Sequence, residues 1–332
     1  MNCFGKNFRV QIFGQSHSEF VGITIDGCPP GINLDQAGFL SDLERRKPGA
    51  KGTTPRKEDD LPKIISGVFN ERSSGAPITI LFENKNTRSA DYEKQRAFPR
   101  PGHADMVASQ KFKGFEDYRG GGHFSGRLTV GIVAAGVVAK KVINELEKAR
   151  KIAIEAQIIE VGGEKDLEAG LDKAVKAKDS VGGIIECTVK NLPAGLGEPF
   201  FDSVESLISH AIFSIPAVKG IEFGSGFFAA KMFGSEHNDQ IINNEGKTET
   251  NHAGGINGGI TNGNDLIFRV AIKPTSSTPK AQFTLNKETG KREQFSVKGR
   301  HDLCIALRAP VVVEAVTAMV LADLLIEWNA YR

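Results

Sequence analysis

Residues 310–328 read PVVVEAVTAMVLADLLIEW, and this stretch decides the fold. Valine, alanine and leucine occupy almost every turn, so the segment has little polar face, and Pro310 suits the first turn of a helix. The segment from Thr129 to Arg150 has the same character, with the run AAGVV at 134–138. Helices of this kind need apolar cover on two sides, so we expect both to lie buried inside the fold.

The same C-terminal stretch, from Ala309 to Trp328, is also about as long as the ~20 residues of a membrane span. Glu314 and Asp323 interrupt it, and each charged side chain costs roughly 2–3 kcal/mol or more in lipid. We therefore predict a buried helix of a soluble protein with no membrane partner, in which both carboxylates accept hydrogen bonds.

Short runs rich in β-branched and aromatic residues accompany the two helical segments. A hairpin is expected from Gln282 to Val297, with Gly290 near its turn. This order favours an α+β fold, a sandwich with buried helices between antiparallel sheets, over a doubly wound parallel fold, whose strands and helices alternate regularly. No low-complexity linker divides the chain, so we predict a single domain over residues 1–332. The expected strands are Val21–Asp26, Lys63–Phe69, Ala76–Glu83, Gly182–Val189 and Leu266–Ile272.

Two turns suggest an internal repeat. Ile25–Gly31 and Val189–Gly195 both run from a strand into a Pro-x-Gly turn, and each is followed by an amphipathic helix. A helix is expected over Val204–Phe213, with His210 in a structural role. Two similar halves would give a pseudo-symmetric sandwich, although one matched turn is a small part of the chain.

The overall charge argues against a protein that coats nucleic acid, because 42 lysines and arginines face 40 aspartates and glutamates, for a formal charge of +2. The first nine residues contain no apolar run of signal-peptide length. The cysteines are scattered, without metal-ligand spacing or a secreted framework. We therefore predict a cytoplasmic protein with reduced thiols at Cys3, Cys28, Cys187 and Cys304.

Five polar clusters combine glycine, histidine, serine and arginine. Taken singly, each has an ordinary explanation: a basic run such as residues 45–47 offsets the negative end of a helix dipole, and glycine-rich turns are more often tight bends than ligand cradles. Jointly they are harder to explain, because they contain His17, His103, His123, His252 and His301. The clusters are residues 13–18, 44–56, 100–105 with 119–127, 251–260 with 273–277, and 299–302.

The third cluster predicts an anion site. Gly120-Gly121-Gly122 leads through Ser125 and Arg127 into the helix expected near Thr129. Backbone N–H groups, a hydroxyl and a guanidinium therefore converge where a helix dipole is positive. Many arginines and several histidines suit a polyanionic substrate whose leaving group must be protonated.

Several common catalytic motifs are missing. The sequence has no Gly-x-x-x-x-Gly-Lys-Ser/Thr loop and no strand-borne Gly-x-Gly-x-x-Gly with an acidic partner, so nucleotide hydrolysis and Rossmann-type dehydrogenation lose support. It has no His-Glu-x-x-His and no paired Cys-x-x-Cys, so we expect no metal. Gly-x-Ser-x-Gly is missing around the candidate serines, which removes the usual hydrolase elbow.

In this order, the clusters resemble those of the chorismate synthase family over nearly the whole chain. Residues 13–18 (FGQSHS) are similar to the family's Gly-Glu-Ser-His-Gly, and residues 100–105 (RPGHAD) match the family without change. Ser18 stands where glycine is usual, Lys47 replaces the third arginine of an Arg-Arg-Arg run, and HFSGR at 123–127 replaces Arg-Ser-Ser-Ala-Arg. Further matches are residues 26–31, 194–199, 273–277 and 299–302.

The resemblance implies a carbon–oxygen lyase of the shikimate pathway, at the last common step toward aromatic amino acids. Phosphate would leave C3 and a proton would leave C6 of 5-enolpyruvylshikimate-3-phosphate in a trans-1,4 elimination that gives chorismate. FMN must be reduced but is not consumed, and NADPH would enter only as a source of reducing equivalents. A homotetramer is also implied.

The resemblance further assigns roles to residues. His17 would be a cationic general acid toward the leaving phosphate, His103 would stabilise the anionic reduced flavin, and Asp302 would accept or relay the proton at flavin N5. The implied substrate-binding residues are Arg46, Lys51, Arg56, Arg100, Ser125, Arg127 and Arg300. The implied flavin-binding residues are His123, Phe124, Ser125, Pro216, Ala217, Gly258, Lys273, Pro274, Thr275, Ser276, Ser277 and Arg300.

Two other functions stay open at this point. One is an NAD(P)H-dependent flavin reductase activity, alone or added, although the sequence has no dedicated nicotinamide motif. The other is a non-catalytic protein that binds phosphoanions or RNA, which would bind with a steep salt dependence and need no flavin. The near-zero net charge and the two motif histidines favour catalysis.

Overall fold

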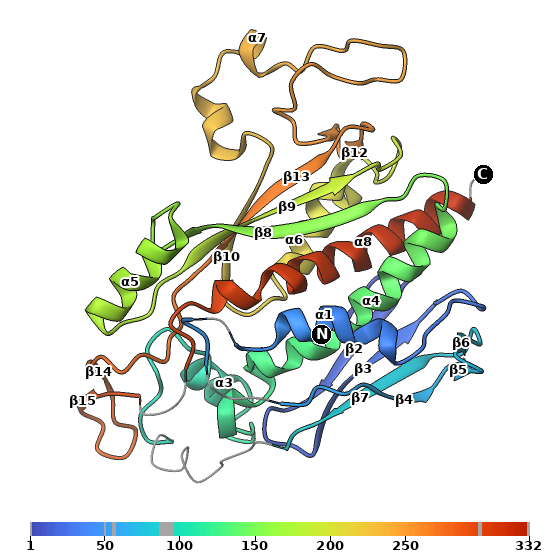
Figure 1. Cartoon of the computed structure of the whole chain (residues 1–332). Coiled ribbons are helices and arrows are strands. Elements are labelled where there is room, and N and C mark those ends of the chain that lie inside the picture. The colour runs from blue at the N-terminus through green and yellow to red at the C-terminus, as the bar shows by residue number, and fades with distance from the viewer. Residues whose placement is uncertain (1, 50, 55–57, 86–95, 298–300, 331–332) are drawn as a thin grey trace.

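A layer of helices lies between two antiparallel β-sheets (Figure 1). This arrangement comes from a computed structural model that describes residues 2–49, 51–54, 58–85, 96–297 and 301–330. The predicted α+β sandwich with helices between antiparallel sheets is therefore confirmed.

In the first sheet, alternate residues of each central strand point toward the helix layer and are buried there. Ile23 on β3 (Phe20–Asp26) pairs with Ile80 on β7 (Ile78–Glu83), and both side chains are fully buried against the helix layer. Neighbouring residues such as Thr24 and Thr79 point the other way and are less buried, which is the period of two that a half-covered sheet requires. The sheet has the order β1 (Cys3–Phe4), β2 (Arg9–Gly14), β3 (Phe20–Asp26), β7 (Ile78–Glu83) and β4 (Lys63–Ser66).

The second sheet follows the same pattern on the other side of the helices. Cys187 on β9 (Gly183–Lys190) pairs with Phe268 on β13 (Leu266–Ile272), and both are fully buried. The strand predicted over Leu266–Ile272 has those bounds in the structure. The sheet has the order β10 (Val218–Phe223), β13 (Leu266–Ile272), β9 (Gly183–Lys190) and β8 (Ala153–Val161).

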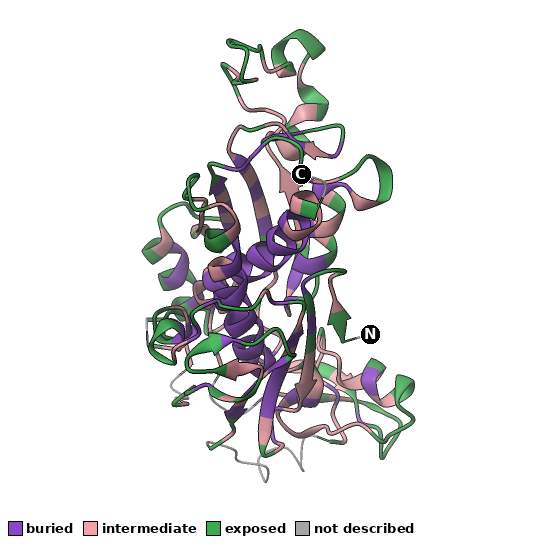
Figure 2. Ribbon diagram, turned by 90° about the vertical axis from the view of Figure 1, so that its right-hand side faces the viewer, coloured by how far each residue is buried: buried purple, intermediate pink, exposed green. Residues whose placement is uncertain are grey.

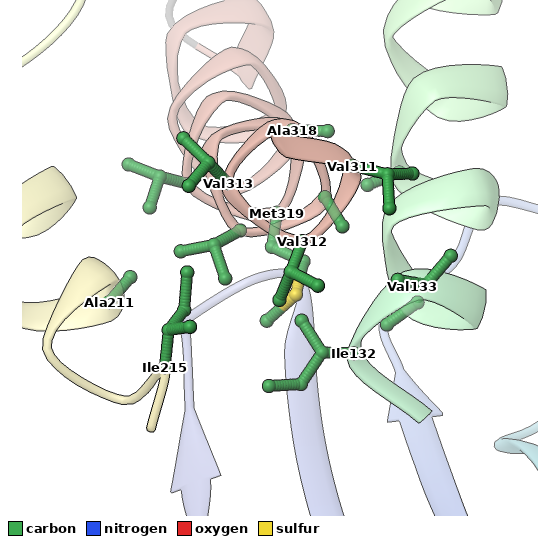
Figure 3. Packing of buried hydrophobic residues seen from close by; sticks show 14 of the residues in the cluster. Ile132, Val133, Ala211, Ile215, Val311, Val312, Val313, Ala318 and Met319 are labelled. Atoms are coloured by element: carbon green, nitrogen blue, oxygen red, sulfur yellow. The ribbon is translucent and has the colours of Figure 1, made fainter. Parts of the chain in front are cut away.

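The two helices predicted to be buried, α4 (Thr129–Leu146) and α8 (Pro310–Ala330), form the centre of the layer. Figure 2 shows that both helices consist mostly of buried residues, drawn in purple. In Figure 3, valines of α8 pack against Ile132 and Val133 of α4 and against Ile215. At one crossing, a Cβ on Gly136 would lie 2.3 Å from the Cβ of Ala315, so only glycine permits this approach. Helix α4 ends four residues before the predicted Arg150, where the sequence becomes charged.

The chain consists of two similar halves, as the matched turns suggested. Each half runs strand, strand, helix, strand, strand, helix: β2-β3-α1-β4-β7-α4 and then β8-β9-α6-β10-β13-α8. In each sheet these strands take the order first, second, fourth, third. Helices α1 (Ala37–Arg46) and α6 (Val204–Ile212) are equivalent, and each follows its Pro-x-Gly turn. The two central helices therefore begin at equivalent places, on the same side of the layer (Figure 1).

Smaller elements complete the described residues. The hairpin predicted from Gln282 to Val297 is present, whereas the strand predicted over Lys63–Phe69 is divided at Gly67, whose φ is +79°. The remaining elements are β5 (Val68–Phe69), β6 (Arg72–Ser73), α3 (Asp105–Lys111), η1 (Arg119–Phe124), η2 (Gly126–Leu128), α5 (Leu167–Ala177), η3 (Phe200–Asp202), η4 (Gly226–Lys231), α7 (Gly234–His237), β11 (Ile256–Asn257), β12 (Ile260–Thr261), β14 (Gln282–Leu285), β15 (Arg292–Phe295) and η5 (Ile305–Arg308).

The two carboxylates on α8 accept hydrogen bonds, as predicted. Glu314 is 3% exposed and accepts from Arg45 Nη2 at 2.6 Å and from Lys140 Nζ at 2.9 Å. Asp323 accepts from backbone N–H groups, including that of Phe8 at 2.7 Å. Within the described ranges, no helix has both the length and the hydrophobicity of a membrane span.

Candidate active site

A cavity of about 720 Å³ lies at the N-terminal ends of α4 and α8. Its walls come from both sheets and from the loops that carry the polar clusters. Because both helices begin here, the positive ends of two helix dipoles face one space, which suits an anionic ligand. Of the residues named from the sequence, the lining includes Arg46, Arg100, His103, His123, Phe124, Ser125, Arg127, Pro216, Ala217, Lys273, Thr275, Ser276, Ser277 and Asp302.

Arg46 and Arg127 share one buried carboxylate, that of Asp60. Arg46 is the last residue of α1, and Arg127 lies in η2 directly before α4. Arg127 also donates from Nε to Asn84 Oδ1 at 2.9 Å and from Nη2 to the Glu83 carbonyl at 3.0 Å. The three charged residues are at most 7% exposed. They join the first sheet to the start of α4 through ionic hydrogen bonds shielded from water.

The charges of this group set its protonation. Burial opposes the ionised form of Asp60, but the guanidinium groups of Arg46 and Arg127 outweigh burial and hold the pKa of its carboxyl below the ordinary value. Burial lowers the pKa of Arg46, yet an arginine stays protonated in a protein. Two cations beside one anion leave a positive charge at the cavity wall.

A second charged group consists of Arg100, His103 and Asp105. The carboxylate of Asp105 accepts from Arg100 Nε and Nη2, each at 2.8 Å, and lies 2.6 Å from His103 Nδ1. Burial opposes the ionised carboxyl, but hydrogen bonds from Arg100 and His103 hold the pKa of Asp105 well below its usual range. Nδ1 of His103 also lies 3.1 Å from Arg100 Nη2. The Asp105 carboxylate is closer, so we infer that Nδ1 carries a proton and donates it in a hydrogen bond to this carboxylate. Nε2 is then the ring nitrogen left for a ligand.

His17 lies directly behind the triglycine wall of the cavity. Gly120 lines the cavity with φ +60°, and a Cβ there would lie 2.2 Å from Cε1 of His17. The backbone amide of Ser16 donates to the Gly122 carbonyl at 3.1 Å, which holds the two segments together. His17 itself is 8% exposed and is not part of the lining. One glycine therefore separates its ring from the cavity.

The loop after β13 forms another wall. Lys273 donates from Nζ to Ser276 Oγ at 2.7 Å and from its backbone N–H to the Ala217 carbonyl at 2.9 Å. Ala217 has φ +74°, a left-handed conformation that costs a non-glycine residue roughly 1–2 kcal/mol. Partial burial and the charge of Lys219 lower the pKa of Lys273. Ala217 thus has a strained backbone, and Lys273 has no bonded carboxylate in the described structure. A bound anion would compensate for both features.

The cavity also has an apolar wall, to which Phe124, Ile215, Pro216, Ile305 and Met319 contribute. A volume of this size falls in the range of about 300–1,000 Å³ that small-molecule and cofactor sites occupy. A planar ring system could lie against the apolar wall while its substituents reach the charged groups. The donor set and the shape thus fit a flavin together with a small acidic substrate.

Asp302 is held by two parts of the chain, the loop at Thr54 and the end of η5 at Arg308. Its carboxylate accepts from the Thr54 backbone N–H at 2.8 Å and from Arg308 Nη2 at 2.7 Å. Arg308 is the last residue of η5, two positions before α8 begins. Asp302 is only 7% exposed, so its orientation is fixed before any ligand arrives.

Some residues named from the sequence lie elsewhere. Lys51 is bonded to Asp172 at 2.7 Å, and its side chain is 60% exposed. Pro274 adjoins Lys273 but is not part of the lining. Gly258 lies in the turn of the β11–β12 hairpin, near the start of β13, whereas the loop at 273–277 follows its end. Seven strand residues at about 3.4 Å each separate these positions by roughly 24 Å. Arg56 and Arg300 lie outside the described residues.

The fourth polar cluster is therefore divided by the length of β13. Its first part makes contacts of its own: His252 Nδ1 lies 2.8 Å from Ser225 Oγ, and its backbone N–H donates to Asp239 at 2.7 Å. Within one copy of the chain, residues 251–260 and 273–277 therefore lie at opposite ends of this strand. Strand β13 is buried and regular, and it carries the chain from one end of the sheet to the other.

Sequence reasoning missed three charged residues of the cavity, Glu58, Asp60 and Arg308. Asp60 closes an acidic run that resembles a solvated surface loop, and nothing local shows that its partners come from α1 and η2. Arg308 could have been noticed, because a basic residue just before a helix start opposes the preference set by the helix dipole.

The described part of the chain contains no cluster of three histidine, cysteine or carboxylate side chains suited to a metal ion.

Comparisons with known proteins agree with the resemblance seen in the sequence. A family model described as chorismate synthase matches residues 8–326. A chorismate synthase from Chitinophaga pinensis is 68% identical, with 100% of this chain and 99% of the relative covered. One from Korarchaeum cryptofilum is 43% identical over 97% of this chain and 96% of the relative. A solved structure titled "Crystal Structure of Chorismate Synthase" has a TM-score of 0.74 and 25% identity, and covers 98% of this chain and 93% of that one.

Proposed function

Because this chain belongs to the chorismate synthase family, we propose that it eliminates phosphate from 5-enolpyruvylshikimate-3-phosphate to give chorismate, with reduced FMN bound beside the substrate. The reaction is a trans-1,4 elimination by a carbon–oxygen lyase, at the last common step toward aromatic amino acids. We place it in the cytoplasm, where the free cysteines of this chain stay reduced.

One observation carries the proposal: residues from distant parts of the chain place four guanidinium groups at one cavity. Arg46, Arg100, Arg127 and Arg308 line it together with His103, and His17 is one glycine away. The substrate brings one phosphate and two carboxylates, so the cations neutralise charge that an apolar cavity could not accept. A site built for an uncharged ligand would not need buried cations in excess of carboxylates.

Phosphate departure follows from this charge arrangement. Arg46 and Arg127 would bind the phosphate at the start of α4, where the dipole and the guanidinium groups stabilise the negative charge that grows on the leaving oxygen. His17, whose ring lies directly behind Gly120, would donate a proton to that oxygen. General acid catalysis of this kind contributes roughly 10²–10⁴-fold to a rate.

The flavin would lie against the apolar wall at Pro216 and Ile305, with Lys273 and the following serines near its acidic substituents. When bound and reduced, it would supply electron density to the substrate ring as phosphate leaves and recover it as the product forms. His103, fixed by Asp105, would present Nε2 to it. Asp302, held by Thr54 and Arg308, would accept or relay the proton at flavin N5.

We also propose that copies of the chain associate, in keeping with the homotetramer expected from the sequence. Residues 224–255 form an arm that projects from the second sheet (Figure 1). Phe227, Phe228 and Phe233 on this arm are 83%, 62% and 76% exposed. Exposed apolar side chains on a projecting arm indicate a contact with a partner. Phe227→Ser with Phe228→Ser should lower the native mass measured by light scattering, and an unchanged tetramer mass would contradict this contact.

The function is tested by anaerobic incubation of the purified protein with the substrate, with FMN that is reduced chemically, oxidised or omitted. We expect phosphate and chorismate in equal amounts only with reduced FMN. His17→Ala and His103→Ala should each slow turnover under the same conditions, and a normal rate in either variant removes that residue from the mechanism. NADPH oxidation with FMN and no substrate would instead reveal the flavin reductase activity.

A further inference from the structure

We propose that Arg308 is a specificity-determining residue that binds the substrate's phosphate together with Arg46, between the N-terminal ends of α4 and α8. This role rests on the proposed function for the identity of the phosphate compound. The binding of a phosphate ion itself does not depend on that function, and the experiment below separates the two.

The position of Arg308 is the first step. It is the last residue of η5, and its side chain, 18% exposed, lines the main cavity. A smaller pocket of about 30 Å³ adjoins the cavity and is lined by Arg46, Arg308 and Thr129 among others. Arg46 and Arg308 are in direct contact, because Arg308 Nη1 lies 3.5 Å from the carbonyl oxygen of Arg46. The two guanidinium groups thus belong to one small space beside the cavity.

The charges around this space do not balance. Within the described residues, the carboxylates bonded to Arg46, Arg127 and Arg308 are Asp60 and Asp302. Three cations therefore share two anions, and the positive ends of two helix dipoles add to the excess. Burial and the neighbouring guanidinium groups of Arg127 and Arg308 lower the pKa of Arg46 against the influence of Asp60. An oxyanion would relieve this repulsion.

Unused hydrogen-bond donors occur on the same two arginines. Nε of Arg46 and Nε of Arg308 are both buried, and neither has a partner among the residues that the structure describes. Arg46 is 5% exposed, so its donor cannot be satisfied by bulk water. Buried donors without partners are rare in proteins and mark places where a ligand or an ordered molecule belongs. A phosphate oxygen would accept from both Nε groups and satisfy the planar donors of arginine.

Arg308 also connects this anion to Asp302, which its Nη2 contacts at 2.7 Å. The same guanidinium would then hold the phosphate through Nε and the carboxylate through Nη2. Arg308 thereby fixes the distance between the leaving group and the group proposed to take the proton. A lysine at this position would keep the charge but could not make both contacts in one plane.

The test measures binding of inorganic phosphate to the full chain without flavin, by titration calorimetry, for the natural protein, Arg308→Gln and Arg308→Lys. Arg150→Gln is the matched control, because Arg150 is exposed, does not line the cavity, and pairs with Glu147 among the described residues. Loss of a charge-assisted contact should weaken phosphate binding roughly tenfold or more in Arg308→Gln. Arg308→Lys should be intermediate, and the control should be unchanged. Pyruvate serves as a second probe that stands in for the substrate's carboxylates.

The possible results distinguish a failure of the Arg308 role from a failure of the proposed function. Phosphate binding that is unchanged in both Arg308 variants overturns the role, as does weakening confined to pyruvate. If Arg308→Gln does not fold, Arg308→Lys alone decides in the same way. In turnover assays, Arg308→Gln should raise KM more than Arg150→Gln does, with phosphate becoming a weaker product inhibitor. If the natural protein binds phosphate through Arg308 but forms no chorismate, the proposed function fails while this site stands.

Discussion

Replacing Asp60 by asparagine removes the carboxylate that two buried arginines share. Arg46 and Arg127 each donate to this group, and Asp60 is 4% exposed. The substitution keeps the size of the side chain but leaves two guanidinium groups side by side without a counter-charge. Asparagine can still accept one hydrogen bond through Oδ1, so the geometry is conserved while the charge is lost.

The expected loss of stability can be worked out from these contacts. Removing one partner of a buried ion pair costs about 3–5 kcal/mol, because the remaining charge stays buried without compensation. The retained hydrogen bond places Asp60→Asn near the lower end, at about 3 kcal/mol. The matched control is Asp26→Asn, since Asp26 pairs with Arg9 on the surface at 2.9 Å, with 44% and 56% of the side chains exposed. Such a pair contributes about 0–1 kcal/mol.

The assay is urea unfolding at pH 7 with and without phosphate. Phosphate should stabilise Asp60→Asn more than the natural protein, because the anion can replace the missing carboxylate between the two arginines. Equal stability of Asp60→Asn and Asp26→Asn would refute the claim that this group is buried and charged. A phosphate effect that is smaller in Asp60→Asn would refute the claim that the arginines face an anion site.

The pH dependence of this difference has a definite sign. The pKa of Asp60 is held below its ordinary value of 3.8 by the two arginines, against burial. A carboxyl whose pKa is lower in the folded protein stabilises it fully above the unfolded pKa, and this stability is lost as pH falls through the folded value. The gap between the natural protein and Asp60→Asn should therefore be constant from about pH 5 to 8 and shrink below about pH 4.

Three further substitutions test other contacts. Gly136→Ala should destabilise the chain by about 1–3 kcal/mol or more, because its Cβ would lie 2.3 Å from that of Ala315, and thermal unfolding measures this. Glu314→Gln should cost about 3–5 kcal/mol of stability with KM unchanged, since its carboxylate is 3% exposed and does not line the cavity, and a large change in KM would contradict this assignment. Asp105→Asn should lower kcat by roughly tenfold or more and change the pH profile of kcat, because His103 loses the carboxylate that orients its ring. An unchanged pH profile would show that His103 does not need this carboxylate.

Much of the fold follows from hydrophobic patterning. The two valine-rich helices were predicted as buried, and α4 begins at the predicted Thr129. Strand β8 was missed because its sequence, AIEAQIIEV, alternates only in part, and its pairing with β9 shifts between Ile158 and Glu160. The close approach at Gly136 could not be predicted, since a glycine inside a helix gives no indication of which partner crosses it.

The candidate site was predictable where residues lie close in sequence. The triglycine run, Ser125 and Arg127 are neighbours in the chain, and the helix that follows gives them a common direction. Asp60 was not predictable in this way, because its role depends on two arginines that approach only after the sheet and both helices have packed. Charged residues in a loop look alike in a sequence, whether they are later exposed or buried.

The central claim is that one cavity holds the substrate's phosphate against buried arginines while its ring lies beside the flavin. The most direct measurement is a crystal structure of the chain with oxidised FMN and 5-enolpyruvylshikimate-3-phosphate. We expect the phosphorus atom within ionic hydrogen-bond reach of Arg46 and Arg127, at the start of α4, and the substrate ring stacked on the flavin near His103. A phosphate bound on another surface, or a flavin outside this cavity, would contradict the account.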